Sequence, residues 1–261
     1  RCMIILKSPR EIALIREAGK VVAEALQAVK AIAVPGTRTI DLNRVASGVF
    51  QKYGAVALFK GVQGGRGKPP FPASICASVN EQVVHGIPGD RRLREGDILS
   101  LDTGCRLNGW CADAAVTLAI GQVALEIQRL LNVTEETLAI AIREMARQRK
   151  WSQVAALMED YVHSHGYSLV EKFVGHGIGR EMHEDPQVPN FVSRALLKND
   201  FWLEEGLVVA IEPMVNVGTK DVRVLGDHWT VETKDRRLSA HVEHTVAITA
   251  SGPQILTQPA A

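Results

Sequence analysis

The chain has 261 residues, of which 46% are hydrophobic and 23% charged, and its formal net charge is +1. This composition is typical of a soluble globular protein with an ample core. The balanced charge gives no signal for a nucleic-acid-binding surface, and no apolar run approaches the ~18 residues that a membrane helix requires.

None of the four cysteines belongs to a C-x-x-C pair. They are Cys2, Cys76, Cys105 and Cys111. The apolar run Met3–Leu6 is too short for the core of a signal peptide, so we expect free thiols and a cytoplasmic location. A Cys105–Cys111 bond across a predicted turn is the less favoured alternative. Arg1 and Cys2 are interpreted as a remnant of cloning or processing.

Two helices are predicted near the N-terminus. Ser8-Pro-Arg-Glu11 is a capping box with proline at the first helical position, and apolar residues follow at helical spacing until Pro35-Gly36. A second helix is expected from about Thr39 to Tyr53, with Gly54 as its C-cap. The glycine- and proline-rich stretch Gly61–Pro72 predicts a loop.

Extended structure is predicted after this loop. Residues 73–84 lead to His85-Gly-Ile-Pro88. Ile98–Asp102 and Ala112–Leu118 are typical of two strands of a hairpin that turns near Leu107-Asn-Gly109.

The same order of elements then returns. A long helix is expected over Ile127–Met145, and a second one is expected to be capped by Ser152 and to end at Gly166. His176-Gly-Ile-Gly179 follows, parallel to the earlier His-Gly-Ile segment. The last predicted strands are Leu207–Glu212 and Val242–Thr249.

This repetition predicts an α+β fold made of two similar halves, roughly residues 8–121 and 122–250. Arg94–Asp102 and Glu204–Glu212 match at corresponding places in the two halves. We expect the halves to be related by a pseudo-twofold axis around a central antiparallel sheet. They would form one domain over residues 1–261.

Four carboxylates lie on predicted strands whose other residues are mostly apolar: Asp102, Asp113, Glu212 and Glu243. Buried carboxylates need a compensating charge, because they lose their hydration. Arginine partners would make a structural core, but no Arg or Lys lies on the strands next to them. Two divalent cations would cancel the charge instead.

His176 is the candidate nitrogen ligand. Gly175 and Gly177 let backbone or a ligand approach it closely. For His176 or His183 alone, a hydrogen bond to the backbone is the simpler interpretation. One imidazole beside four carboxylates favours manganese, iron(II), cobalt or zinc with open coordination positions, and paired ions are a recurring hydrolytic device. His85 and His183 then remain as acid–base groups.

Six motifs resemble those of the type I methionine aminopeptidases, and the resemblance runs from about Ile4 to Thr249. They are Phe71–Pro88, Leu101-Asp-Thr103, Gly175-His-Gly-Ile-Gly179, His183–Gln187, Ile211-Glu-Pro-Met214 and Glu243-His-Thr245. The resemblance implies the pita-bread (creatinase/aminopeptidase) fold. It also implies removal of the initiator methionine from nascent polypeptides whose second residue is small. A monomer is expected, with transient ribosome contact as a further expectation.

The resemblance also implies roles for single residues. Asp113 and Glu243 would bridge two divalent ions, Asp102 would hold one of them, and His176 with Glu212 the other. Glu212 would also accept the proton of the attacking water.

Two further histidines have implied catalytic roles. His85 would contact the scissile amide or the departing amine, and His183 the substrate carbonyl and the developing oxyanion.

The resemblance further implies an apolar pocket for the methionine side chain, lined by Phe71, Cys76, Met182 and Trp229. For each of these four residues, ordinary core packing is the alternative. A monovalent cation, Na⁺ or K⁺, would bind backbone carbonyls of Asn80, Gln82 and Ser239.

Two other functions compete with this interpretation. An X-Pro aminopeptidase or prolidase would share the fold, but it is expected to carry an N-terminal domain before Ser8. A catalytically inactive pita-bread binding protein is expected to lack one or more of the five ligands, all of which are present here.

Overall fold

The computed structural model describes residues 3–65 and 67–259 of the chain. The interpretation of Arg1 and Cys2 as a remnant, and the free thiol expected for Cys2, lie outside the described residues.

The first two predicted helices are confirmed as α1 (Pro9–Ile32) and α2 (Thr39–Tyr53). Both halves of the Ser8–Glu11 capping box are formed, since each side chain accepts a hydrogen bond from the other residue's backbone N–H. Gly54 ends α2 in the left-handed conformation at φ 65°. The other helices are α3 (Leu125–Glu144), α4 (Trp151–Ser164) and α5 (Arg194–Lys198).

The start predicted for α4 is wrong. Ser152 lies inside the helix, and Lys150 occupies the N-cap position. The Ser152 hydroxyl instead donates to Asp200 Oδ2 at 2.7 Å. Gln153 Oε1 accepts from the backbone N–H groups of Arg149 and Lys150, both at 3.0 Å, so a glutamine three residues after the cap satisfies donors there.

The main sheet is antiparallel and runs in the order β1-β4-β5-β14-β9-β7-β8, with β2 paired to β4 and β15 to β14. Asn108 and Gly109 form the two-residue turn between β4 and β5, and both have positive φ, as the sequence predicts for a tight hairpin. The strands are β1 (Val56–Ala57), β2 (Cys76–Val79), β4 (Ile98–Leu107), β5 (Trp110–Ala119), β7 (Gly175–Gly177), β8 (Glu184–Val188), β9 (Val208–Ile211), β14 (Glu243–Thr249) and β15 (Gly252–Ile255).

Two small sheets adjoin the main one. The first has the order β13-β10-β6, and the second β11-β12-β3. Their strands are β3 (Gln82–Val84), β6 (Ser168–Leu169), β10 (Met214–Asn216), β11 (Val222–Val224), β12 (Val231–Thr233) and β13 (Ser239–His241).

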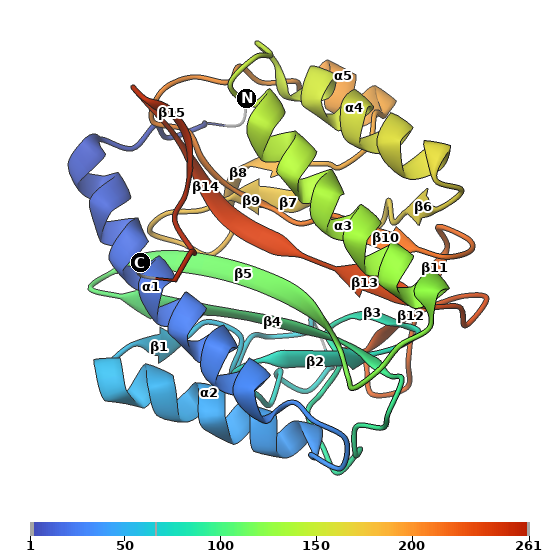
Figure 1. Ribbon diagram of the computed structural model, residues 1–261. Helices are drawn as coiled ribbons and strands as arrows, with labels where there is room; N and C mark the ends of the chain where they lie inside the picture. Colours follow the sequence, from blue (N-terminus) through green and yellow to red (C-terminus); the bar gives the residue numbers. More distant parts are fainter. Residues whose placement is uncertain (1–2, 66, 260–261) are drawn as a thin grey trace.

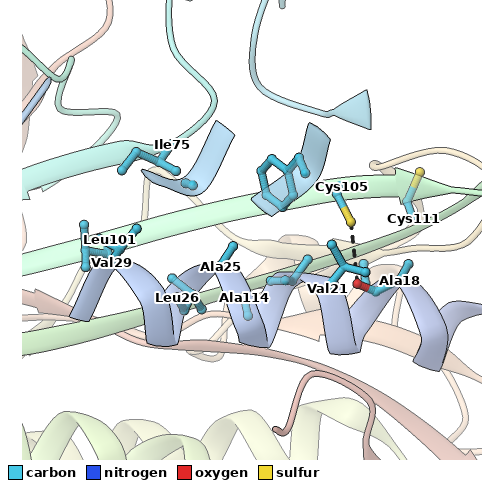
Figure 2. Close-up of a cluster of buried hydrophobic side chains, with 14 of the residues drawn as sticks. Ala18, Val21, Ala25, Leu26, Val29, Ile75, Leu101, Cys105, Cys111 and Ala114 are labelled. Carbon is cyan, nitrogen blue, oxygen red and sulfur yellow. Dashed lines mark hydrogen bonds between the residues drawn. The ribbon is translucent and has the colours of Figure 1, made fainter. Parts of the chain in front are cut away.

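The helices pack in pairs, α1 with α2 and α3 with α4, and α1 and α3 both cross one face of the main sheet (Figure 1). Side chains of α1 such as Val21 and Ala25 pack there against Leu101 and Ala114 of β4 and β5 (Figure 2). Because side chains alternate along a strand, the residues next to Leu101 and Ala114 must point to the opposite face. Those residues are Ser100, Asp102, Asp113 and Ala115.

Cys76, Cys105 and Cys111 are free, as expected. Cys105 pairs in register with Ala112 and lies against α1, where its thiol contacts the Ala18 carbonyl at 3.5 Å (Figure 2). Cys111 pairs with Arg106, so its side chain points to the other face of the same hairpin. The alternative of a bond between Cys105 and Cys111 is therefore wrong.

The strand order places β4 and β5 next to β14 and β9, so each expected half supplies two central strands. The His-Gly-Ile segments, however, do not occupy matching places. His176 lies on β7 in the main sheet, whereas His85 follows β3 in a small sheet. That local sequence match does not correspond to equivalent positions in the fold.

Candidate metal centre and active-site cavity

Three of the four predicted carboxylates form a row across the face of the sheet that the helices leave open. Asp102 on β4 pairs with Ala115 on β5, and Ala115 pairs with Glu243 on β14. Glu212 follows Ile211, the residue of β9 that pairs with His244, and so stands next to Glu243. The small side chain of Ala115 leaves space between the acids on either side of it.

Asp113, the fourth acid, lies two residues before Ala115 and therefore points to the same face. Its partner on β4 is Gly104. A Cβ atom at Gly104 would come within 3.1 Å of the Asp113 carboxylate, so glycine leaves the room that this carboxylate occupies. The expectation that the hairpin brings Asp102 and Asp113 together is confirmed by the cavity that both side chains line.

His176 faces the acids from β7. Its Nδ1 donates to the Gly177 carbonyl at 2.9 Å, which leaves Nε2 free as a ligand atom. Nε2 lies 3.6 Å from Glu212 Oε1. One ligand atom each from Asp113, His176 and Glu243 lie within 4.8 Å of one another, which makes these three residues a candidate metal site.

A divalent metal fits these residues. Asp102, Asp113 and Glu243 are 9%, 3% and 2% exposed, and each has one carboxylate oxygen without a hydrogen-bond partner in the described part of the chain. Among the same residues, no Lys or Arg forms an ion pair with any of the four acids. The arginine core that the sequence left open as an alternative is therefore absent from residues 3–65 and 67–259, and cations remain the natural source of compensating charge.

Burial shifts the pKa values of this cluster strongly. It raises the pKa of Asp113 to about 7, and it raises the pKa values of Asp102, Glu212 and Glu243 well above their ordinary range, with repulsion between the acids adding to the effect for these three. Burial lowers the pKa of His176 to about 4, with a contribution from His183. At neutral pH the imidazole is therefore neutral, the form that binds metals.

These shifts predict a pH dependence for the metal-free protein. Between about pH 7 and pH 8 the unfolded carboxyl groups are fully ionised, whereas folded Asp113, with a pKa of about 7, is still partly protonated. Because the folded state binds more protons than the unfolded state, stability must fall as the pH rises through this window. We expect the melting temperature, followed by circular dichroism with a chelator present, to decrease across it.

With saturating manganese most of the decrease should disappear, because the ligands are then already deprotonated in the folded state. Above about pH 7.5 the histidines are almost entirely neutral in both states and add little slope. The raised pKa values of the Cys76, Cys105 and Cys111 thiols leave a smaller decrease that manganese does not remove. If the melting temperature fell equally with pH in the presence and absence of manganese, the assignment of these acids as ligands would be wrong.

His85 and His183, the two predicted accessory histidines, line the same cavity. Burial, then His183, lowers the pKa of His85 to about 4, and burial lowers the pKa of His183. The rings of His176 and His183 meet edge to face at 4.4 Å between centroids. His85 adopts a left-handed backbone at φ 59° and packs edge to face against Phe173 and Trp229.

All four residues predicted for the methionine pocket also line this cavity: Phe71, Cys76, Met182 and Trp229. The Phe71 and Trp229 rings meet at 5.3 Å with an interplanar angle of 74°. Sequence reasoning missed Phe59 and Val62, which complete the apolar wall from the loop before Phe71. Both residues lie in a loop, which has no regular alternation of side chains, so the sequence did not indicate where their side chains point.

His241 was also missed. It is 1% exposed, and neither ring nitrogen has a hydrogen-bond partner within the described ranges. Its Nε2 lies 3.9 Å from Glu212 Oε2, and burial lowers its pKa to about 3. No clear signal in the sequence indicated it, because His241 ends β13 of a small sheet and Glu243 begins β14 of the main sheet, so alternation along one strand does not relate them.

The residues predicted for a monovalent cation lie together around the β2–β3 turn and β13. The Ser239 N–H donates to the Asn80 carbonyl at 3.0 Å, and Gln82 Oε1 accepts from Val79 N–H. Ser239 pairs with Asn216, and the Ser239 hydroxyl and the Asn216 Oδ1 atom both lack hydrogen-bond partners among the residues described.

Comparison with known proteins identifies the family. The chain matches Metallopeptidase family M24 over residues 13–250. The methionine aminopeptidase of Clostridium perfringens is 46% identical over 255 residues, which cover 98% of this chain and 99% of that protein.

Solved structures agree with this match. The structure of methionine aminopeptidase from Thermotoga maritima has a TM-score of 0.91 at 39% identity, and the match covers 98% of this chain and 100% of the Thermotoga chain. Prolidase from Pyrococcus furiosus shares the fold alone, with a TM-score of 0.75 at 20% identity, and this chain spans 66% of its length. The α+β pita-bread fold expected from the sequence is confirmed. The chain belongs to the methionine aminopeptidases of Metallopeptidase family M24.

Proposed function

We propose that this enzyme uses two divalent metal ions to remove the N-terminal methionine from nascent polypeptides whose second residue is small. The observation that carries the proposal is the buried Asp113, His176 and Glu243 cluster, which lies in the same cavity as a predominantly apolar pocket. The full-length similarity to methionine aminopeptidases favours this function over an X-Pro hydrolase or an inactive binding protein.

Five residues would hold the ions. Asp113 and Glu243 would contact both, Asp102 would hold one, and His176 with Glu212 the other. Buried carboxylate oxygens without partners on Asp102, Asp113 and Glu243 support this assignment. The oxygen-rich set with one imidazole suits manganese, iron(II), cobalt or zinc. Such ions would lower the pKa of a water molecule and polarise the carbonyl of the scissile bond.

Proton transfer in the reaction would be carried out by a side chain of the protein, Glu212. Glu212 accepts the proton of the attacking water and passes it toward the departing amine. Burial, then the charge of Asp113, raises the pKa of Glu212, and a raised pKa favours uptake of that proton. His241, 3.9 Å from Glu212, lies where it can orient that carboxylate.

Two neutral histidines complete the proposed catalytic residues. His183 would donate to the substrate carbonyl and the developing oxyanion, and His85 would contact the scissile amide or the departing amine. The lowered pKa values of both keep their rings uncharged at neutral pH, so they would act as neutral hydrogen-bonding groups beside the metal ions.

The methionine side chain would occupy the apolar part of the cavity. Phe71 and Trp229 present ring edges and faces that suit a thioether sulfur, and Cys76 and Met182 add polarisable sulfur atoms. Burial, then the charge of Asp102, raises the pKa of Cys76 well above its usual range, so its thiol stays neutral as this pocket requires.

A monovalent cation, Na⁺ or K⁺, is proposed at the backbone of Asn80, Gln82 and Ser239. The unpartnered oxygens of Ser239 and Asn216 support a polar ligand there. The Asn80 carbonyl already accepts from Ser239, so a cation would share that oxygen.

We also propose that residues 1–261 act as one catalytic domain with an internal repeat of roughly residues 8–121 and 122–250. The joining of strands from both halves in one sheet supports this. A monomer is part of this proposal. A cytoplasmic location and transient ribosome contact follow from the proposed substrate. None of the helices in residues 3–65 and 67–259 combines the length and apolar character of a membrane span.

Mass spectrometry of paired peptides tests the function. We expect a peptide that begins Met-Ala to lose its methionine when divalent metal is present, and one that begins Met-Lys to stay intact, because a long second side chain would meet the cavity wall. A peptide that begins Leu-Ala controls for general aminopeptidase activity. Equal trimming of all three peptides, or trimming that persists after chelation, would contradict the proposal.

A further inference from the structure

The loop Ile178–His183 joins β7 to β8 and carries two residues of the active-site cavity, Met182 and His183. Loop residues hold a precise position only when contacts outside the loop hold them. The residue that follows His183 is Glu184, the first residue of β8, so whatever holds Glu184 also holds His183.

Glu184 forms a buried ion pair with the N-terminal segment. Its Oε2 lies 2.5 Å from Lys7 Nζ, and the two side chains are 14% and 4% exposed. Lys7 Nζ also donates to the Ile5 carbonyl at 2.8 Å. Burial raises the pKa of Glu184, but the hydrogen bonds from Lys7 and from the loop backbone outweigh it, so the pKa stays below its ordinary value and the carboxylate stays charged.

The other oxygen of Glu184 binds the loop itself. Oε1 accepts from the backbone N–H of Arg180 at 2.7 Å and of Glu181 at 3.1 Å. One carboxylate therefore connects the N-terminal segment to the middle of the loop. Gly179 makes room for this arrangement, because a Cβ there would lie 2.5 Å from Lys7 Cε and 2.8 Å from Glu184 Oε1.

Lys7 is itself fixed to the main sheet. Its N–H donates to the Gly206 carbonyl at 2.7 Å, and the Gly206 N–H donates to Ile248 of β14 at 2.8 Å. Gly206 has φ +93°, and a Cβ at this position would lie 2.8 Å from the Lys7 carbonyl oxygen. These hydrogen bonds hold the Lys7 backbone, through Gly206, next to β14, the strand that also carries Glu243.

Buried ion pairs contribute little net stability, because the loss of hydration offsets the attraction between the charges. Their better-supported effect is to fix one arrangement of the chain. The loop's second ion pair, Arg106 with Glu181 at 2.6 Å, is 38% and 70% exposed, and such surface pairs have small effects. The two pairs on one loop therefore differ in burial, and this difference provides a test.

We propose that Lys7 and Glu184 are positioning residues for catalysis, which hold the Ile178–His183 loop so that His183 reaches the substrate carbonyl. This inference rests on the role proposed above for His183. It makes the N-terminal segment before α1 part of the catalytic architecture, although none of residues 3–8 lines the cavity.

Glu184→Gln is the first test. Glu184 accepts hydrogen bonds with both oxygens, one from Lys7 and one from the loop N–H groups. A glutamine keeps one oxygen and replaces the other with an NH₂ donor, so one of these two contacts must be lost. We expect kcat for a Met-Ala peptide to fall about 10- to 100-fold, the range for a small misplacement of a catalytic group. KM and metal content should stay near wild type, since the contact matters in the transition state. Glu181→Gln, which neutralises an exposed carboxylate on the same loop, should stay within about twofold.

A double variant separates positioning from stability. Lys7→Met with Glu184→Met removes both charges, and apolar replacement of a buried pair commonly preserves stability. We expect it to fold with a melting temperature near wild type and still to lose kcat, because the Arg180 and Glu181 N–H groups have lost their acceptor. Lys7→Arg, which keeps the charge, should retain more activity than Lys7→Met.

Normal kcat in the double variant, or a lowered melting temperature with normal kcat in Glu184→Gln, would assign the pair a purely structural role and overturn the inference. His183→Ala is measured in parallel and should lose about 100-fold or more in kcat while keeping its metal. If His183→Ala is impaired and the pair variants are not, only the present inference fails. If His183→Ala is itself fully active, the role proposed for His183 fails.

Discussion

Glu212→Gln is expected to lower kcat by about 100- to 10,000-fold, the range in which a positioned general base contributes. Glu212 has two tasks in the proposed reaction, since it binds metal and accepts the proton of the attacking water. Its two oxygens lie 3.6 Å from His176 Nε2 and 3.9 Å from His241 Nε2. Glutamine keeps the shape of the side chain but cannot take up the proton.

Steady-state kinetics on a Met-Ala peptide measure this effect, with metal content determined on the same samples. Glu204→Gln is the matched control, because Glu204 is an exposed acid shortly before β9 and does not line the cavity. A Glu212→Gln enzyme with full metal and near-normal kcat would show that another group accepts the proton. Lost activity with lost metal would assign Glu212 mainly to ligation.

Asp113→Asn is expected to weaken divalent metal binding by more than about 100-fold, beyond the 10- to 100-fold typical of residues that only support a ligand. Asp113 is 3% exposed, has one oxygen without a hydrogen-bond partner among the described residues, and belongs to the ligand cluster with His176 and Glu243. An amide carries no charge to offset a dication. Isothermal titration with manganese measures the affinity, and activity should fall with it.

The same substitution should act in the opposite direction on the metal-free protein. Removal of one acid from a buried group of four relieves repulsion, so metal-free Asp113→Asn should melt at a higher temperature than metal-free wild type at about pH 8. Asp90→Asn, at a side chain that is 92% exposed, controls for the change in net charge. Unchanged metal affinity together with a lowered melting temperature would mean that Asp113 is structural.

Much of the local structure could be predicted because its causes are local. The Ser8–Glu11 capping box, the left-handed Gly54 and the Asn108-Gly109 turn each depend on a few neighbouring residues, and all three formed as expected. The cap at Ser152 failed for a non-local reason. Asp200, 48 residues away, binds the hydroxyl that was expected to cap the helix.

The match between His85-Gly-Ile and His176-Gly-Ile shows the limit of short motifs. Three identical residues in a row do not determine which sheet a segment joins, and these two segments joined different ones. His241 shows the same limit. It stands two residues before Glu243, but its proximity to Glu212 depends on the arrangement of β13 and β14 beside β9.

The sequence by itself determined which residue types could bind metal and which face of each strand they would share, since alternation along a strand is a property of the backbone. It also determined the start of α1, both ends of α2 and the β4–β5 turn. Only the tertiary structure decided which atoms meet. The row from Asp102 through Ala115 to Glu243 requires the register of three strands, two of them more than 120 residues apart. The contact of Lys7 with Glu184 spans 177 residues. Such pairings are set by burial of the whole core, which no short stretch of sequence specifies.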